Sequence, residues 1–140
     1  MGKKELVIFI FSVFLIAVLI SGCTSQASDI GATKRVGNSQ LYCTLDSVNS
    51  VVVNNAAYYL INVTLQNNGL DEAEFTAQDF TLSDLPTDNQ NTDIILGANS
   101  SNEYGFYFEK DPLNLGHSYI FGCHDPADIQ QSADFNLNLN

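Results

Sequence analysis

Apolar and polar residues alternate with a period of two along much of the chain, which is typical of strands with one buried face. The clearest stretch, 59–66, reads Tyr-Leu-Ile-Asn-Val-Thr-Leu-Gln. The same alternation occurs at 41–46, 106–108, 119–123 and 135–139. Residues Val51–Val53 begin either a further strand or a hairpin. The pattern therefore predicts a succession of short strands after residue 40.

Turn-forming residues separate these stretches, at 67–69, 85–88, 98–101, 111–112, 116 and 125–126. No segment keeps a helical period, and only Pro126–Ser132 is expected to form a short helical turn. Roughly six to eight short strands in about 100 residues are typical of two packed antiparallel sheets. The sequence thus predicts an all-β fold, specifically an antiparallel β-sandwich.

One run of motifs is more specific than this general pattern. Residues 58–69 read Tyr-Tyr-Leu-Ile-Asn-Val-Thr-Leu-Gln-Asn-Asn-Gly, and Phe75, Asp79-Phe80-Thr81-Leu82 and an aromatic strand at 104–108 follow. This order resembles the immunoglobulin-like domain of unknown function, sometimes called telokin-like, of many bacterial and archaeal lipoproteins. The resemblance covers residues 40–140 and implies an immunoglobulin-like β-sandwich. That family has no settled biochemical activity, so the resemblance implies no reaction.

Each of these motifs has an expected structural role. Asn68-Gly69 is expected to supply backbone with positive φ where two strands reverse. Asp79 is expected to accept hydrogen bonds from nearby backbone amides, while Phe80 and Leu82 point into the core.

The first 22 residues differ from the rest of the chain. Lys3 and Lys4 precede an apolar run, Leu6–Ile20, which predicts a hydrophobic signal helix. The segment Ile20-Ser21-Gly22-Cys23 resembles the lipobox of prokaryotic lipoproteins. That resemblance implies cleavage before Cys23 and a lipid on its thiol, which would hold the protein to the membrane. The alternative is an uncleaved signal anchor in which Cys23 is an ordinary thiol.

Three regions follow from this pattern. Residues 1–22 are predicted to be a lipoprotein signal peptide, and 23–39 the lipidated cysteine and a Ser/Thr/Gly-rich flexible tether. The alternative for 24–39 is a first edge strand of the domain. Residues 40–140 are predicted to be the sandwich. The lysines before the apolar run place the domain on the extracytoplasmic side, at the cell surface or in the periplasm.

The charge of the chain limits its partners. Five basic and 16 acidic residues give a net charge of −11, and nucleic-acid binding needs clustered Lys and Arg. We therefore expect no nucleic-acid partner. An acidic surface also repels anionic headgroups, so the lipid rather than the charge is expected to hold the domain to a membrane.

Two cysteines remain once Cys23 carries a lipid. Cys43 and Cys123 both lie on the apolar phase of their strands, and disulfides persist in exported proteins. An even remainder of two favours one bridge between them. The alternatives are two separate buried thiols or a pair of metal ligands.

Candidate catalytic groups are few. Cys123-His124-Asp125, with His117 upstream, superficially suggests a nucleophile with its base. Adjacent strand residues point to opposite faces, however, so His124 is poorly placed to activate Cys123. A zinc site needs four ligands, and the chain has only two histidines. We therefore expect no enzyme, no cofactor and no zinc site.

Acidic residues gather in three loops: Asp71, Glu72 and Glu74; Asp84, Asp88 and Asp93; and Asp125 and Asp128. Such loops are usually solvated, and calcium binding is the alternative.

Two further sets of residues concern the surface. Asn62 and Asn99 both begin glycosylation sequons, and Asn99 is the better acceptor because it lies in a predicted loop. Tyr42, Tyr58 and Tyr107 either form an exposed binding face or cover a second sheet.

These observations together predict a lipid-anchored extracytoplasmic binding or scaffolding module without catalytic activity. Its partner is expected to be a surface protein or a glycan, held by loops or by an exposed sheet face. The alternative is a surface carrier of calcium or of a small solute.

Overall fold

The computed structural model describes residues 28–87, 93–111 and 118–139. The strands are β1 (Thr33–Arg35), β2 (Leu41–Val53), β3 (Ala56–Asn67), β4 (Ala73–Thr76), β5 (Phe80–Leu82), β6 (Asp93–Leu96), β7 (Ser100–Glu109), β8 (Ser118–Asp125) and β9 (Asp128–Asn138). A short 3-10 turn, η2 (Ala77–Asp79), joins β4 to β5. The prediction of an all-β fold is confirmed for the described residues.

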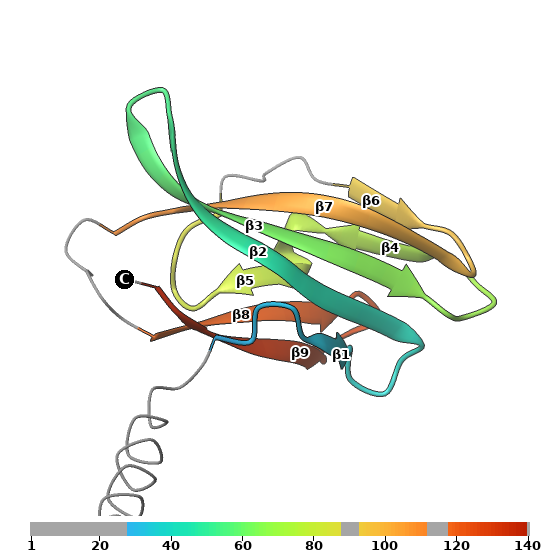
Figure 1. Ribbon diagram of the computed structural model, residues 1–140. Helices are drawn as coiled ribbons and strands as arrows, with labels where there is room; N and C mark the ends of the chain where they lie inside the picture. Colours follow the sequence, from blue (N-terminus) through green and yellow to red (C-terminus); the bar gives the residue numbers. More distant parts are fainter. Residues whose placement is uncertain (1–27, 88–92, 112–117, 140) are drawn as a thin grey trace, which may run out of the picture.

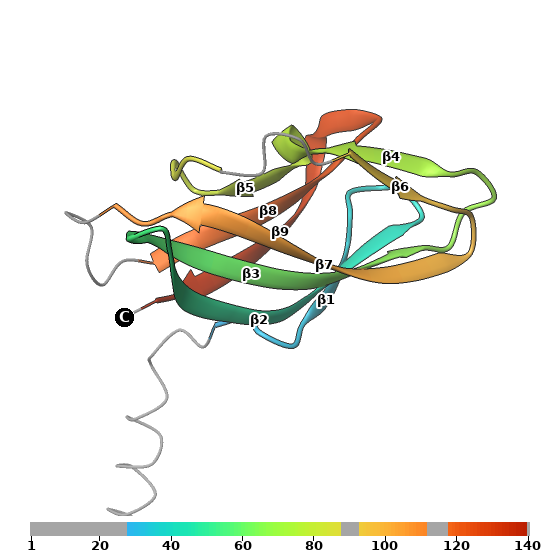
Figure 2. The same ribbon diagram turned by 90° about the horizontal axis from the view of Figure 1, so that it is seen from above.

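The strands form antiparallel sheets in two layers. One layer is a four-stranded sheet in the order β1-β2-β3-β7. Across the core from it lie a three-stranded sheet, β5-β8-β9, and a two-stranded sheet, β4-β6 (Figures 1 and 2). The hairpin that joins β2 to β3 curls away from the rest of its sheet (Figure 1). Among the described residues, no element covers the outer face of the four-stranded sheet in this sandwich-like arrangement.

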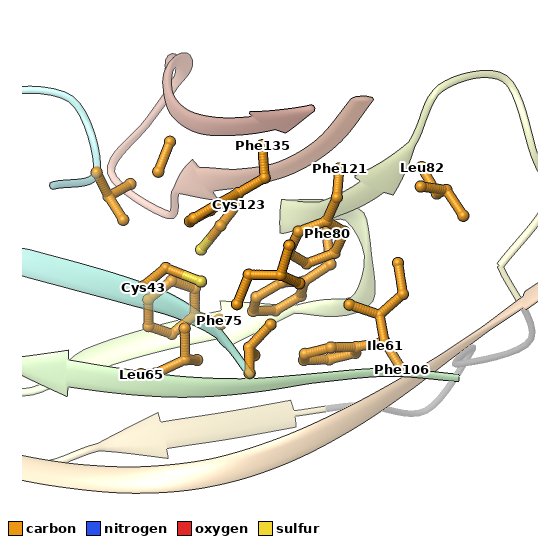
Figure 3. Packing of buried hydrophobic residues seen from close by; sticks show 14 of the residues in the cluster. Cys43, Ile61, Leu65, Phe75, Phe80, Leu82, Phe106, Phe121, Cys123 and Phe135 are labelled. Carbon is orange, nitrogen blue, oxygen red and sulfur yellow. The ribbon is translucent and has the colours of Figure 1, made fainter. Parts of the chain in front are cut away.

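The core lies between the layers and is rich in phenylalanine. Phe80 and Phe106, from opposite layers, stack with ring centroids 4.0 Å apart, and Phe75 packs 5.6 Å from Phe80. Figure 3 shows these rings at the centre of the cluster. The expectation that Phe80 and Leu82 point inward is confirmed, because both are essentially unexposed.

The first edge strand lies where a tether was expected. β1 pairs with β2, and the Asp29 backbone N–H donates to the Asn136 carbonyl on β9 at 2.8 Å. The folded domain therefore begins by Ser28, and the predicted boundary at residue 40 is wrong. The alternative of a first edge strand within 24–39 is the one that the structure supports. β1 has only three residues, Thr-Lys-Arg, and all are polar, so this strand shows no apolar alternation.

A partly exposed ion pair holds this segment against β9. Lys34 Nζ donates to Asp29 Oδ2 at 2.8 Å and to the Asp134 carbonyl at 2.6 Å. The Asn136 backbone N–H also donates to Asp29 Oδ2 at 2.8 Å. The hydrogen bond from Lys34, and then the one from Asn136, lowers the pKa of the Asp29 carboxyl below its ordinary 3.8.

A lowered carboxyl pKa makes this contact sensitive to acid. The folded state favours the ionised Asp29, so its stabilisation is present above about pH 4 and is lost as the pH falls through the lowered pKa. We expect Asp29→Asn to cost about 1 kcal/mol or less at pH 7 and a smaller amount as the pH falls towards 2, as measured by urea unfolding. An equal cost at both pH values would contradict this role for the charge.

Two turns differ from the sequence-based expectations. Asn68 and Gly69 do not have positive φ, whereas Asn54 (49°) and Asn55 (65°), in the hairpin between β2 and β3, do. At the predicted position, Asn67 Oδ1 instead accepts the Gly69 N–H at 2.9 Å. The side chain of Asn67 therefore shapes that turn without left-handed backbone.

The predicted helical turn at 126–132 is also absent. Asp125 Oδ1 accepts the Ala127 N–H at 2.9 Å and closes a tight turn, after which β9 begins at Asp128. The start of β9, Asp-Ile-Gln-Gln-Ser, lacks a regular alternation, which is why the sequence did not indicate a strand there.

Asp79 accepts a backbone hydrogen bond, as its motif predicted. Asp79 is buried, and its Oδ2 accepts the Thr76 N–H at 2.6 Å.

The predicted signal helix, Cys23, Asp88 and His117 lie outside the described residues. In the part of the chain that the structure covers, no helix has the length and apolarity of a membrane span.

Candidate functional site

The outer face of the four-stranded sheet carries the three tyrosines singled out in the sequence. Tyr42 on β2 and Tyr58 on β3 are half-buried, and Tyr107 on β7 is 38% exposed. The rings of Tyr58 and Tyr107 meet edge to face, with centroids 6.2 Å apart. Of the two alternatives, the structure supports the exposed face, because no second sheet covers these residues among those described.

A shallow groove lies in the middle of this face. Its volume is about 420 Å³, within the range of small-ligand sites. The lining residues are Asp46, Ser47, Asn62, Glu103, Tyr104 and Gly105. They come from β2, β3 and β7, so the groove crosses the centre of the sheet.

Two backbone features make the groove. The register of β2 against β3 shifts between Leu45 and Ser47, which makes Asp46 an extra residue and bends the strand. On β7, Gly105 lies opposite Asn62 and has no side chain to fill the space. A Cβ at residue 105 would lie 3.0 Å from Asn62 Oδ1 and 3.2 Å from Leu60 Cδ1.

Polar side chains are held in place around this hollow. Thr64 Oγ1 donates to Asp46 Oδ2 at 2.8 Å, and Asn62 Nδ2 donates to Ser47 Oγ at 2.9 Å. Glu103 lies on the opposite wall and is exposed. The groove thus offers two carboxylates and an amide as hydrogen-bonding groups. The strand positions of Tyr107 and Gly105, two residues apart on one face, place the Tyr58–Tyr107 pair beside it.

Sequence reasoning found the tyrosines but missed Gly105 and Asp46. An isolated glycine inside an aromatic alternation, Tyr104-Gly105-Phe106, is a signal for a gap in a strand. The bulge at Asp46 has no such signal, because it appears only when the two strands are paired.

A second concave region lies at one end of the sandwich. It has a volume of about 780 Å³ and gathers Asp71, Glu72 and Glu74, from the turn before β4 and β4 itself, with Asp125 at the end of β8. The structure thus brings together two of the three acidic loops, while Asp84 and Asp93 lie elsewhere. No group of three or more His, Cys, Asp or Glu side chains within the described ranges is arranged to hold a metal ion.

The other carboxylates of these loops have structural partners. Asp125 is buried and closes its own turn. Asp128 accepts the Gln130 N–H at 3.1 Å and Gln131 Nε2 at 3.0 Å. Asp125 and Asp128 therefore stabilise their own turn, and the concave region at this end of the sandwich has an acidic, open surface.

The two domain cysteines meet in the core. Cys43 on β2 and Cys123 on β8 are both fully buried, and in Figure 3 their sulfur atoms point toward each other across the layers. Both are free thiols in the structure, so the expected disulfide is not formed there. The hydrogen bond with Cys43, and then burial, raise the pKa of Cys123 well above its ordinary value. The bridge between Cys43 and Cys123 stays a prediction.

His124 lies on the other face of β8 from Cys123. Its Nε2 is 3.1 Å from Thr81 Oγ1, and its Nδ1 is 3.0 Å from the Ile129 carbonyl. The structure therefore does not bring the histidine to the thiol, as the alternation of strand residues predicts.

The two sequon asparagines differ in their surroundings. Asn62 lines the groove, with its side-chain amide bonded to Ser47. Asn99 is exposed in the turn between β6 and β7, with φ of 52°. Asn99 stays the better predicted acceptor.

Comparison with known proteins adds one likeness of fold. No family model matches the sequence, and no curated protein matches it. Among solved structures, the chain is similar to the yjhA protein from Bacillus subtilis, with a TM-score of 0.55 and 15% sequence identity. The match covers 79% of this chain and 98% of that one. At this identity the likeness concerns the fold alone.

Proposed function

We propose that the protein is a lipid-anchored, extracytoplasmic module of immunoglobulin-like architecture that binds a glycan on the outer face of its four-stranded sheet. The lipobox-like segment ending at Cys23 supports the anchor and the location. The two antiparallel layers and the motif from Asn67 to Leu82 support the immunoglobulin-like assignment. The binding role rests on the groove.

The groove supports glycan binding because it combines the two kinds of group that bind sugars: aromatic rings and hydrogen-bonding side chains. Aromatic rings pack against the apolar C–H face of a pyranose, and the Tyr58–Tyr107 pair provides such a surface. Carboxylates and amides hydrogen-bond to hydroxyl groups, and Asp46, Asn62 and Glu103 provide them. The two carboxylates would repel an acidic sugar, so the ligand class is neutral or amino-sugar glycans.

A glycan array tests this proposal directly. Full-length protein in detergent is applied to immobilised neutral, amino-sugar, sialylated and sulfated oligosaccharides. We expect retention on neutral or amino-sugar glycans. We expect Gly105→Val, which fills the hollow, and Tyr107→Ala, which removes the ring, each to weaken binding at least about tenfold, or about 1.4 kcal/mol.

Tyr42→Ala is the matched control. Tyr42 lies on the same face but pairs with Arg35 and Gln66, away from the groove. It should bind as the unaltered protein does, and Tyr42→Ala and Tyr107→Ala should keep its melting temperature within a few degrees. Retention only on acidic glycans, or equal binding by all variants, would contradict the proposal. Capture of a surface protein through this face, with an empty array, would replace the glycan with a protein partner.

A further inference from the structure

The second half of β2 forms an open edge of the four-stranded sheet. β1 covers the first half, where Thr33–Arg35 pair with 42–44, and Leu45 exchanges hydrogen bonds with Gly31 and Ala32 at 2.7 and 3.0 Å. From Ser47 to Val53, β2 pairs only with β3 among the described residues. This segment therefore presents an uncovered strand edge.

The register shows which backbone groups face outward. Leu45 bonds toward β1, so its pair with Val63 is not the hydrogen-bonded type. After the bulge, alternation along the ladder turns the N–H and C=O groups of Val48, Ser50 and Val52 to the open edge. Such a row of donors and acceptors is a template for another strand.

The side chains of this edge carry no charge. From Ser47 to Asn62 the sequence has no Asp, Glu, Lys or Arg, although the chain as a whole has a net charge of −11. Val52 is 73% exposed and Val53 is 43% exposed. Natural sheets usually protect a long open edge with charged residues or proline, and this half of β2 has neither.

We propose that this edge pairs with the same edge of a second copy of the chain. Two strands related by a two-fold axis run antiparallel, as an isologous interface requires. Because the segment is uncharged, two strongly acidic molecules meet there without opposing like charges. The pairing would join two four-stranded sheets into one of eight strands.

A lysine that contacts the middle of the edge selects the register. Lys110 Nζ donates to Ser50 Oγ at 2.6 Å from the inner side, above the Tyr59 ring. An axis at Ser50 would bring two ammonium groups together. An axis at Val51 pairs Ser50 with Val52 of the other copy, keeps the lysines apart and sets the two Val51 side chains against each other. Four hydrogen bonds form in this register.

A lipid surface and an unrelated strand are the other possible occupants. Insertion into lipid would leave the edge amides of Val48, Ser50 and Val52 without partners, which is costly. A strand from another protein would be expected to carry basic residues that complement the acidic surface. Residues 47–53 of this edge include no carboxylate with which such basic residues could pair. Both observations favour a second copy.

Cysteine cross-linking of the full-length chain in detergent tests the pairing. We expect Val51→Cys to form a covalent dimer under copper-phenanthroline oxidation, in which two thiols lose two protons and two electrons to the oxidant. Val53→Cys is the matched control on the same edge, because the register places the two copies of residue 53 far apart. We expect its dimer to form at least about tenfold more slowly.

Sedimentation of the chain without added cysteines is the second measurement. We expect the monomer and dimer to exchange with concentration, and Val52→Lys, a change at an exposed position, to abolish the dimer. The proposal is overturned if the unaltered chain stays monomeric up to high micromolar concentration, or if the two cysteine variants cross-link equally. Neither result would affect glycan binding, so this proposal and the proposed function fail separately.

Discussion

If the proposed export is correct, reduction of the protein taken from its native membrane is expected to lower its free energy of unfolding by about 4.5 kcal/mol. A bridge between Cys43 and Cys123 closes a loop of about 80 residues, and the chain-entropy relation gives this value for such a loop. Domains of this size are stable by about 5–15 kcal/mol in total. The melting temperature should therefore fall by about 15 °C or more under a reductant.

The burial of both thiols implies that a bridge would have to form during folding. The two thiols come from facing layers and meet in the core, where both are fully buried. On oxidation they lose two protons and two electrons to a disulfide donor of the exterior, which can reach them only during folding. Once buried, the thiol of Cys123 has a raised pKa, so little reactive thiolate exists in the folded domain.

The double variant Cys43→Ala/Cys123→Ala is the control for this prediction. Its unfolding should be independent of reductant, and its stability should lie near that of the reduced protein. If the native protein without reductant yields two alkylated domain cysteines after unfolding, the bridge does not exist, and the structure's two free thiols are the state of the exported protein.

Phe80→Ala is expected to destabilise the domain by about 3–5 kcal/mol. Phe80 is 1% exposed, stacks on Phe106 at 4.0 Å and touches Phe75, so its removal leaves a cavity between the two layers. Large-to-small changes at such sites lose both the burial of the ring and the contacts of its neighbours. Urea unfolding at neutral pH measures the loss.

Ile120→Ala is the matched control for this cavity. Ile120 lies on β8 in the same layer but is 50% exposed, and exposed positions usually change stability little. We expect its cost to stay below about 1 kcal/mol. A cost for Phe80→Ala as small as this would show that the phenylalanine stack does not hold the layers together.

The sequence predicted those strands in which buried and exposed residues alternate regularly. In β3, every second residue from Tyr59 to Leu65 is buried, and the same periodicity placed Cys43 and Cys123 inside. Burial of one face of a sheet imposes this period directly, so it is visible without tertiary information.

The features that the sequence did not predict depend on pairing rather than on periodicity. β1 is polar and is held by backbone bonds and by Asp29, which pattern alone does not show. The groove depends on a bulge at Asp46 and on the meeting of Gly105 with Asn62 from another strand. The candidate site was therefore predictable as an aromatic face, but its hollow was not.

The intact mass of the protein extracted from its native membrane, with and without reduction, tests the central claim of an exported, lipid-anchored domain. We predict the mass of residues 23–140 plus a lipid on Cys23, and a gain of two hydrogens on reduction. A mass that still includes residues 1–22 and no lipid would contradict the anchor, the location and the assignment of Cys23.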